Sequence, residues 1–130
     1  MSTKSKGTNA ERELIHKFWA NGFAAIRSAG SGSMRYPSPD ILASKNNKVI
    51  AIECKVTSDN HKYLEKQEIV DLVEFCRLFS AIPYIAVKFN REGWFFLRIQ
   101  DLKETDKSFM VDLDLAKYKG MLFETVIGFH

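Results

Sequence analysis

The stretch "PSPDILASKNNKVIAIECKVT", residues 37–57, places charged side chains inside the most strand-like part of the chain. Two apolar runs, 40–44 and 49–57, flank the polar turn "KNNK", a pattern that predicts two antiparallel strands. Side chains alternate across a strand, so Ile50 and Ile52 share a core face while Glu53 and Lys55 share the opposite face. Taken alone, that second face is typical of a strand with solvated charges.

Asp40, at the head of the first run, changes that interpretation. A tight turn between the two strands can bring Asp40 beside Glu53, with Lys55 one step further on the same face. Two close carboxylates repel each other unless one is protonated or a cation bridges them, and a hard divalent ion with oxygen ligands is the simplest bridge. A nearby ammonium can orient water or stabilise negative charge on phosphorus. The constellation is suited to phosphodiester hydrolysis.

The length and charge of the chain set wider limits. Its 130 residues are typical of one domain, and a hydrophobic fraction of 45% is ample for one core. No apolar window is long enough for a transmembrane helix, and the N-terminus has no apolar signal segment, so we expect a cytoplasmic protein with two reduced cysteines and no membrane partner. Residues 1–66 carry 11 Lys/Arg and 6 Asp/Glu, and this basic half favours an anionic partner such as nucleic acid.

Periodicity and turn signals predict an α/β fold in which a mixed central β-sheet is flanked by helices in the order α-β-β-β-α-β-β. We expect a flexible basic arm over 1–7 and a helix over 8–22, begun by a capping box of Thr8 and Glu11. The other predicted elements are strands at 23–28, 40–44, 49–57, 83–89 and 94–99, a connector at 58–63 and a helix at 64–80. Residues 100–130 have weaker patterns, which predict a short strand at 108–112 and a helix at 112–120.

The helix at 64–80 and the run "WFFL" at 94–97 are apolar on more than one face. A surface helix needs a single apolar stripe, and 130 residues leave little chain to cover a second face. We therefore expect these segments to form a subunit interface.

The spacing of "PD" (39–40) and "ECK" (53–55) resembles the PD-(D/E)xK nuclease signature. Several longer stretches resemble the archaeal Holliday junction resolvases, over roughly residues 4 to 100. These stretches are "KGTNAERELIHKFWANGFAAIRSAGSGS" (6–33), "ECKVT" (53–57), "VEFCRLFSAIPYIAVKF" (73–89) and "GWFFL" (93–97). The resemblance implies a restriction-endonuclease-like nuclease core, a single nuclease domain over 1–130, a homodimer, and cleavage of four-way DNA junctions.

The resemblance also implies roles for individual residues. Asp40 and Glu53 match the acidic pair of the signature and Lys55 its lysine, while Glu11 matches an acidic residue of the first helix that is catalytic and linked to the metal. Ser31 matches a catalytic-loop serine near the scissile phosphate. The implied metal is Mg²⁺, for which Mn²⁺ is expected to substitute.

Further residues are candidates for DNA binding. Arg12 and Arg27 match basic positions beside the site, and Ser31 is expected near the phosphate. Lys6 and Arg35 are weaker candidates because exposed cations are usually only solvated. Gln67 opens the second helix near the strand of Lys55 and could hold water or phosphate.

Two alternatives stay open at this point. A related nuclease of the same signature could act on flaps, nicks or duplex DNA, and a non-catalytic DNA-binding module could keep the fold. The complete set of Asp40, Glu53 and Lys55 argues against the second alternative, because a module that only binds DNA has no use for clustered carboxylates.

Overall fold

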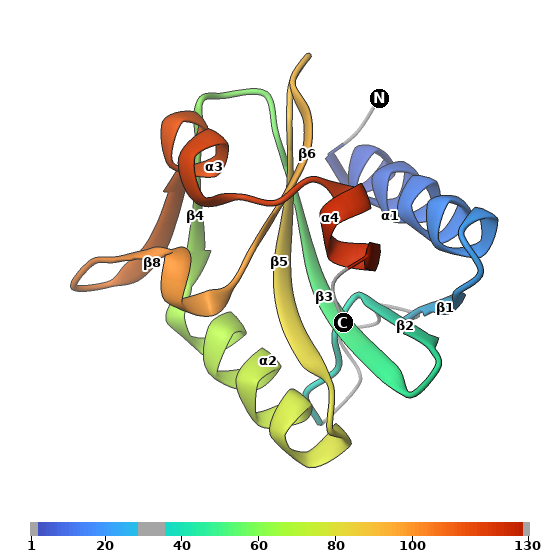
Figure 1. The fold of residues 1–130 in the computed structure, drawn as a ribbon. Helices are drawn as coiled ribbons and strands as arrows, with labels where there is room; N and C mark the ends of the chain where they lie inside the picture. Colours follow the sequence, from blue (N-terminus) through green and yellow to red (C-terminus); the bar gives the residue numbers. More distant parts are fainter. Residues whose placement is uncertain (1–2, 29–35, 129–130) are drawn as a thin grey trace.

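Helices pack on both faces of a five-stranded central sheet in the computed structural model, which describes residues 3–28 and 36–128 (Figure 1). The first elements are α1 (Thr3–Ala20), β1 (Ala24–Arg27), β2 (Ile41–Lys45), β3 (Lys48–Thr57), β4 (His61–Glu65), α2 (Lys66–Phe79), β5 (Ile82–Phe89) and β6 (Gly93–Leu97). The remaining elements are η1 (Ile99–Asp101), β7 (Lys103–Glu104), β8 (Ser108–Asp112), α3 (Leu113–Lys119) and α4 (Phe123–Gly128). The predicted class, a mixed sheet flanked by helices, is confirmed.

The central sheet has the strand order β1-β2-β3-β5-β6, in which β3 and β5 are parallel and the other neighbours antiparallel. The β2–β3 hairpin was predicted from its turn, and it forms because Asn46 and Asn47 adopt the positive φ angles, 51° and 69°, that a tight hairpin turn requires. This hairpin fixes the register on which the candidate site depends.

Two hydrophobic clusters lie on opposite faces of the sheet. Ile50 and Ile52 of β3 pack with α1 and α4 in one cluster, as the alternation in the sequence predicted. Ala51 of β3 faces the other cluster, which includes Leu72 of α2 and Ala116 of α3. The central strand is therefore covered on both faces at Ile50, Ala51 and Ile52, and the charged pair of Glu53 and Lys55 follows toward its C-terminal end.

Helix α1 differs from its prediction at the N-terminus. It begins at Thr3, so Thr8 and Glu11 lie inside the helix and the predicted capping box at its start is wrong. Residues 3–7 belong to the helix rather than to a flexible arm. Both side chains instead bond to Arg27, whose Nε lies 3.0 Å from Glu11 Oε1 and whose Nη2 lies 3.4 Å from Thr8 Oγ1.

The C-terminal third is more ordered than the sequence indicated. The strand and helix at 108–120 are confirmed as β8 and α3. The predicted connector at 58–63 is partly wrong, because His61–Glu65 forms β4, which pairs with β8 in a second sheet of order β4-β8-β7. That pairing is long-range, which explains why local pattern did not reveal it.

Strand β6 is buried by the chain itself. The exposed fractions of Trp94, Phe95, Phe96 and Leu97 are 7%, 8%, 0% and 0%. Phe123 of α4 packs on one face of this strand and Ala116 of α3 lies in the cluster on the other. The expectation that the run 94–97 forms a subunit interface is therefore wrong, because the C-terminal helices cover it.

None of the helices in the described part of the chain has the length and apolar run needed to cross a bilayer.

Candidate active site

The β2–β3 hairpin brings Asp40 to the charged end of β3. Ile41 pairs with Ile52, so Asp40, one residue earlier, falls opposite Glu53 in the antiparallel register. The Asp40 backbone carbonyl accepts a hydrogen bond from the Ser28 amide at 2.8 Å, and its Oδ2 accepts one from the Cys54 amide at 2.8 Å. Asp40 is thus held between the end of β1 and the middle of β3. Its position opposite Glu53 is the one that the turn in the sequence predicted.

Burial raises the pKa of both carboxyl groups, and Asp40 adds to the shift at Glu53. Burial raises the pKa of Glu53, and the charge of Asp40 raises it further, to about 8. Burial also raises the pKa of Asp40, although the Cys54 amide and the Lys55 charge oppose that shift. The pair therefore holds more negative charge than its surroundings accommodate, and a bound cation would relieve it.

This donor set fits a divalent metal ion as a partial site. Among residues 3–28 and 36–128, no three acidic, histidine or cysteine side chains form a complete metal-binding group. Asp40 and Glu53 therefore offer two carboxylates, and the other ligands would be water, a backbone carbonyl such as that of Cys54, or a substrate phosphate. Mg²⁺ is commonly held in this way, by one or two carboxylates together with phosphate oxygens and waters.

Glu68, on the first turn of α2, is a site residue that the sequence reasoning missed. Its Oε2 forms an ion pair with Lys55 Nζ, and its Oε1 accepts a hydrogen bond from the Glu65 amide at 3.1 Å. The Glu65 and Glu68 side chains form a reciprocal capping box at the start of α2. That "E-x-x-E" pattern was the available signal, but a capping pattern does not reveal that β3 lies next to it.

The Lys55 ammonium stays charged in these surroundings. Burial alone would lower its pKa, but the bond to Glu68 and the charges of Glu53 and Asp40 outweigh burial and raise the pKa. Burial alone would raise the pKa of Glu68, but its bond with Lys55 outweighs burial and lowers the pKa. The ion pair fixes a cation beside the carboxylate pair.

A cavity of about 110 Å³ opens between β3 and α2 at this point. It is lined by Ser38, Pro39, Glu53, Glu68, Asp71 and Leu72. Water can therefore reach Glu53 and Glu68 from the side of the loop that precedes β2.

Glu11 approaches this group from α1 but is bonded elsewhere. Burial raises its pKa, and the Asp40 charge raises it further, against the opposing Arg27 guanidinium. Glu11 thus lies close enough to Asp40 for the Asp40 charge to shift the Glu11 pKa. The Glu11 carboxylate forms an ion pair with Arg27 at 3.0 Å. Its predicted role in metal binding stays a prediction.

The remaining predicted residues surround this centre or lie outside the described ranges. Arg12 is exposed on α1, and Arg27 is partly buried at the end of β1. Gln67 is exposed and donates a hydrogen bond to Asp71 at 2.8 Å, and Lys6 lines a different cleft. Ser31 and Arg35 lie outside the described residues.

Comparisons with known proteins show the family of this chain. The family described as "Archaeal holliday junction resolvase (hjc)" matches residues 2–130. This chain belongs to that family. The match extends through the C-terminal thirty residues, beyond the part in which the sequence resemblance was evident.

Individual members of the family are similar over nearly their full length. The crossover junction endodeoxyribonuclease Hjc of Archaeoglobus fulgidus is 41% identical over 96% of this chain and 97% of its own. The protein of the same name from Methanocaldococcus jannaschii is 36% identical over 95% of this chain and 87% of its own. The solved structure of the Archaeoglobus Hjc, titled a Holliday junction resolvase, matches with a TM-score of 0.86 at 39% identity and covers 92% of this chain and 98% of that chain.

Proposed function

We propose that this chain is a structure-specific endodeoxyribonuclease that resolves four-way DNA junctions by paired, symmetric nicks, in homologous recombination and repair in the cytoplasm. The observation that carries the proposal is the convergence of Asp40, Glu53 and Lys55 on one face of the β2–β3 hairpin, in a chain of the resolvase family. A non-catalytic DNA-binding module would have no use for this partly buried, closely placed pair of carboxylates.

Asp40 and Glu53 would hold Mg²⁺, or Mn²⁺ in its place, and Glu11 would support the same ion from α1. The bound ion would supply Lewis-acid chemistry at the scissile phosphate. The high pKa of Glu53 supports this assignment, because a cation between the two carboxylates removes the repulsion that raises it.

Lys55 would act on the reacting groups themselves. Water attacks phosphorus in line and loses a proton, the bond from phosphorus to the 3′-oxygen breaks, and that oxygen gains a proton. The products are a 5′-phosphate and a 3′-hydroxyl. The Lys55 ammonium would orient the water or stabilise the negative charge that develops on phosphorus.

Glu68 would position Lys55. Its carboxylate is held on one side by the first turn of α2 and on the other by the ammonium, so it limits the conformations that the long lysine side chain can adopt. Preorganising a charge in this way contributes to rate rather than to substrate affinity.

DNA would reach the site along α1 and the end of β1. Arg12, Arg27 and Lys6 would bind phosphates, and Ser31, Arg35 and Gln67 remain candidate contacts from the loop before β2 and from α2. Arg27 already links β1 to α1 through its ion pair with Glu11. A DNA phosphate bound by Arg27 would therefore be held at a fixed position relative to the Glu11 carboxylate.

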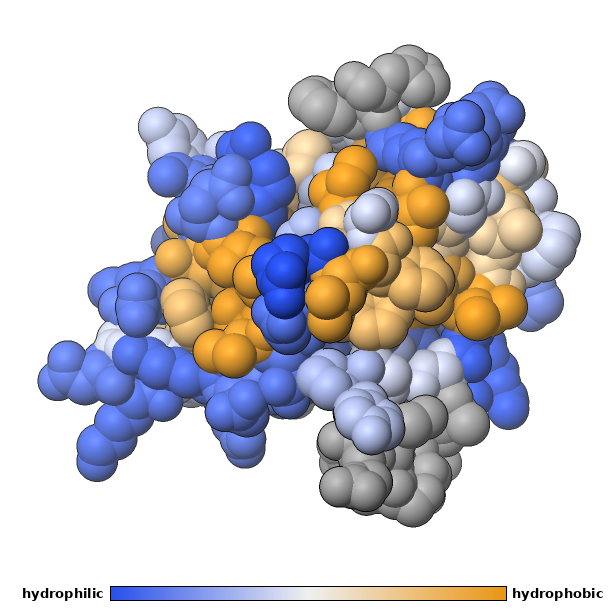
Figure 2. All heavy atoms as spheres, turned by 90° about the horizontal axis from the view of Figure 1, so that it is seen from below, coloured by the Kyte–Doolittle hydropathy of each residue, from blue (hydrophilic) through white to orange (hydrophobic). Residues whose placement is uncertain are grey.

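A homodimer would supply two such sites. Ile69, Leu72 and Cys76 of α2 are buried, as expected for the face of α2 that packs on the sheet. Other apolar side chains at this end of the molecule remain exposed, namely Val70 (57%), Val73 (43%), Leu78 (69%), Phe79 (51%) and Ile82 (41%). Figure 2, which views the molecule from the side on which α2 lies, shows hydrophobic side chains gathered across this face.

We call these five residues the α2 face and propose that two copies of the chain meet there. A four-way junction has near two-fold symmetry, so an isologous dimer presents one site to each of two opposed strands.

The test is cleavage of a four-way junction that cannot migrate, beside a linear duplex of the same sequence, with Mg²⁺ and with EDTA. We expect paired symmetric cuts in the junction alone, no cutting in EDTA, and loss of cutting but not of binding in Asp40→Asn. Equal cutting of the duplex would favour the related nuclease that acts on duplex DNA, and cutting in EDTA would exclude the metal mechanism.

A further inference from the structure

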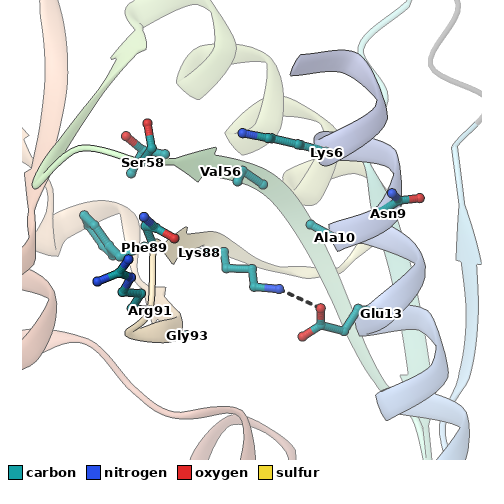
Figure 3. A pocket seen from close by; sticks show the side chains of 12 residues that line it. Lys6, Asn9, Ala10, Glu13, Val56, Ser58, Lys88, Phe89, Arg91 and Gly93 are labelled. Carbon is teal, nitrogen blue, oxygen red and sulfur yellow. Dashed lines mark hydrogen bonds and ion pairs between the residues drawn. The ribbon is translucent and has the colours of Figure 1, made fainter. Parts of the chain in front are cut away.

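A cleft of about 550 Å³ lies apart from the cutting residues (Figure 3). It is bounded by the N-terminal half of α1, the C-terminal end of β3 and the turn between β5 and β6. Val56 and Thr57, the last two residues of β3, line it. Because side chains alternate along the strand, Val56 lies on the face opposite Glu53 and Lys55. None of the residues assigned above to cutting lines this cleft.

The cleft is basic. Its lining residues include three cations, Lys6, Lys88 and Arg91, and a single carboxylate, Glu13. Lys6 extends from α1 toward the end of β3 in Figure 3. Among the described residues, neither Lys6 nor Arg91 forms an ion pair. Two cations are therefore free to bind an anion there.

Glu13 holds the third cation. Its Oε2 lies 2.7 Å from Lys88 Nζ, and its Oε1 accepts a hydrogen bond from the Trp94 indole at 3.1 Å. Burial opposes the charge of Glu13, but the bonds to Lys88 and Trp94 outweigh burial and lower its pKa. Glu13 thus repels an incoming anion and competes with it for Lys88.

Arg91 is placed at the rim in an unfavourable backbone conformation. Its φ is 66°, in the left-handed region that glycine adopts readily and an arginine does not. The turn that carries it is tied to β3, because the Asn90 amide donates a hydrogen bond to the Thr57 carbonyl at 3.1 Å. Strained residues held on a fixed frame are typical of functional sites.

We propose that this cleft, at the C-terminal end of β3, binds the phosphodiester backbone of a junction arm. Lys6 and Arg91 bind phosphate oxygens directly, and Lys88 joins them when the phosphate displaces Glu13. The inference rests on the proposed function in one respect, namely that the ligand is the same junction DNA.

The experiment measures junction binding over a range of salt concentrations, with Asp40→Asn as the parent so that no DNA is cut. The salt slope is the slope of the logarithm of the binding constant against the logarithm of the salt concentration. We expect Lys6→Gln and Arg91→Gly each to reduce this salt slope by about one. The double variant should bind roughly tenfold more weakly. Glu13→Gln should bind more tightly than the parent, because it removes a negative charge and releases Lys88 while its amide oxygen still accepts from Trp94.

Two controls separate this result from other effects. Lys107→Gln removes an exposed cation from the turn between β7 and β8, in the second sheet, and should leave the slope unchanged. Arg91→Gly should unfold at the parent temperature or above, because glycine accepts the positive φ. Paired cutting of junctions by the unaltered chain tests the proposed function separately. Parental salt slopes in Lys6→Gln and Arg91→Gly, or weaker binding by Glu13→Gln, would overturn the cleft inference.

Discussion

Glu53 lies partly buried in the middle of β3, where an ionised carboxylate is unfavourable. Burial and the Asp40 charge raise its pKa from 4.5 to about 8. Burial also raises the pKa of Asp40, and burial together with the Asp40 charge raises the pKa of Glu11. An acid whose folded pKa is raised binds more protons in the folded state than in the unfolded state. Its contribution to stability is complete below the unfolded pKa and is lost as pH rises through the folded pKa.

We therefore predict that the metal-free protein loses stability as pH rises from about 5 to 8, and that Glu53→Gln largely removes this loss. Mg²⁺ should restore stability to the unaltered chain at pH 8 but much less to the variant. Denaturant unfolding in EDTA at several pH values measures the effect, with Glu124→Gln, an exposed carboxylate of α4, as control. A variant with the parental pH dependence would contradict the raised pKa.

A second prediction at the residue scale concerns Glu68 and its ion pair with Lys55. Glu68→Gln should slow single-turnover cutting by about 10- to 100-fold, in the range seen when the partner of a site residue is lost, with junction affinity unchanged or tighter. Glutamine retains the capping box, so α2 should begin at the same residue.

Asp71→Asn is the matched control for Glu68. It removes one negative charge from the rim of the same cavity but does not break the bond to Lys55. If both variants slowed cutting equally, general electrostatics rather than positioning of Lys55 would explain the result.

Two arginines, one on α1 and one beside it, differ in how firmly they are held, and this difference leads to a prediction at the scale of the element. Arg12 is exposed, whereas Arg27 of β1 is fixed against α1 by Glu11 and Thr8. Arg12→Ala should reduce the salt slope of junction binding by about one without changing stability.

Arg27→Ala should reduce the same slope and, in addition, lower the free energy of unfolding by about 1 kcal/mol, because it leaves the partly buried Glu11 unpaired. Salt titrations and thermal unfolding of both variants check this difference. Equal stability of the two would mean that the Arg27–Glu11 bond does not tie β1 to α1.

The α2 face leads to a prediction for the whole molecule. Phe79→Glu should convert the dimer to a folded monomer, because Phe79 is half exposed and its replacement leaves Ile69 and Leu72 in the core. Resolution by paired cuts should be lost with the dimer. Analytical ultracentrifugation and junction cleavage on the same preparations measure both properties.

Tyr118→Glu, at a side chain of α3 that is 84% exposed and lies outside the α2 face, should leave the dimer intact. A folded Phe79→Glu monomer that still cuts both strands in a paired manner would exclude the dimer as the reason for the exposed α2 face.

The sequence alone determined the β2–β3 hairpin and the neighbourhood of Asp40, Glu53 and Lys55. Both depend on local information, namely strand alternation and a two-asparagine turn, and Asp40 precedes Glu53 by only 13 positions. The second helix and the following strands were likewise predicted because their apolar periodicity is strong.

Only the tertiary structure decided the partners that come from distant segments. Glu68 reaches Lys55 because α2 packs against β3, and β4 exists because β8 pairs with it. The sequence pattern of Thr8 and Glu11 predicted a helix cap, but both residues lie inside a longer helix. Their side chains instead bond to Arg27 of β1, which is 16 residues beyond Glu11. The cleft of Lys6, Val56 and Arg91 joins three segments, α1, the end of β3 and the β5–β6 turn. Their approach depends on the packing of the whole chain, so it cannot be predicted from local sequence.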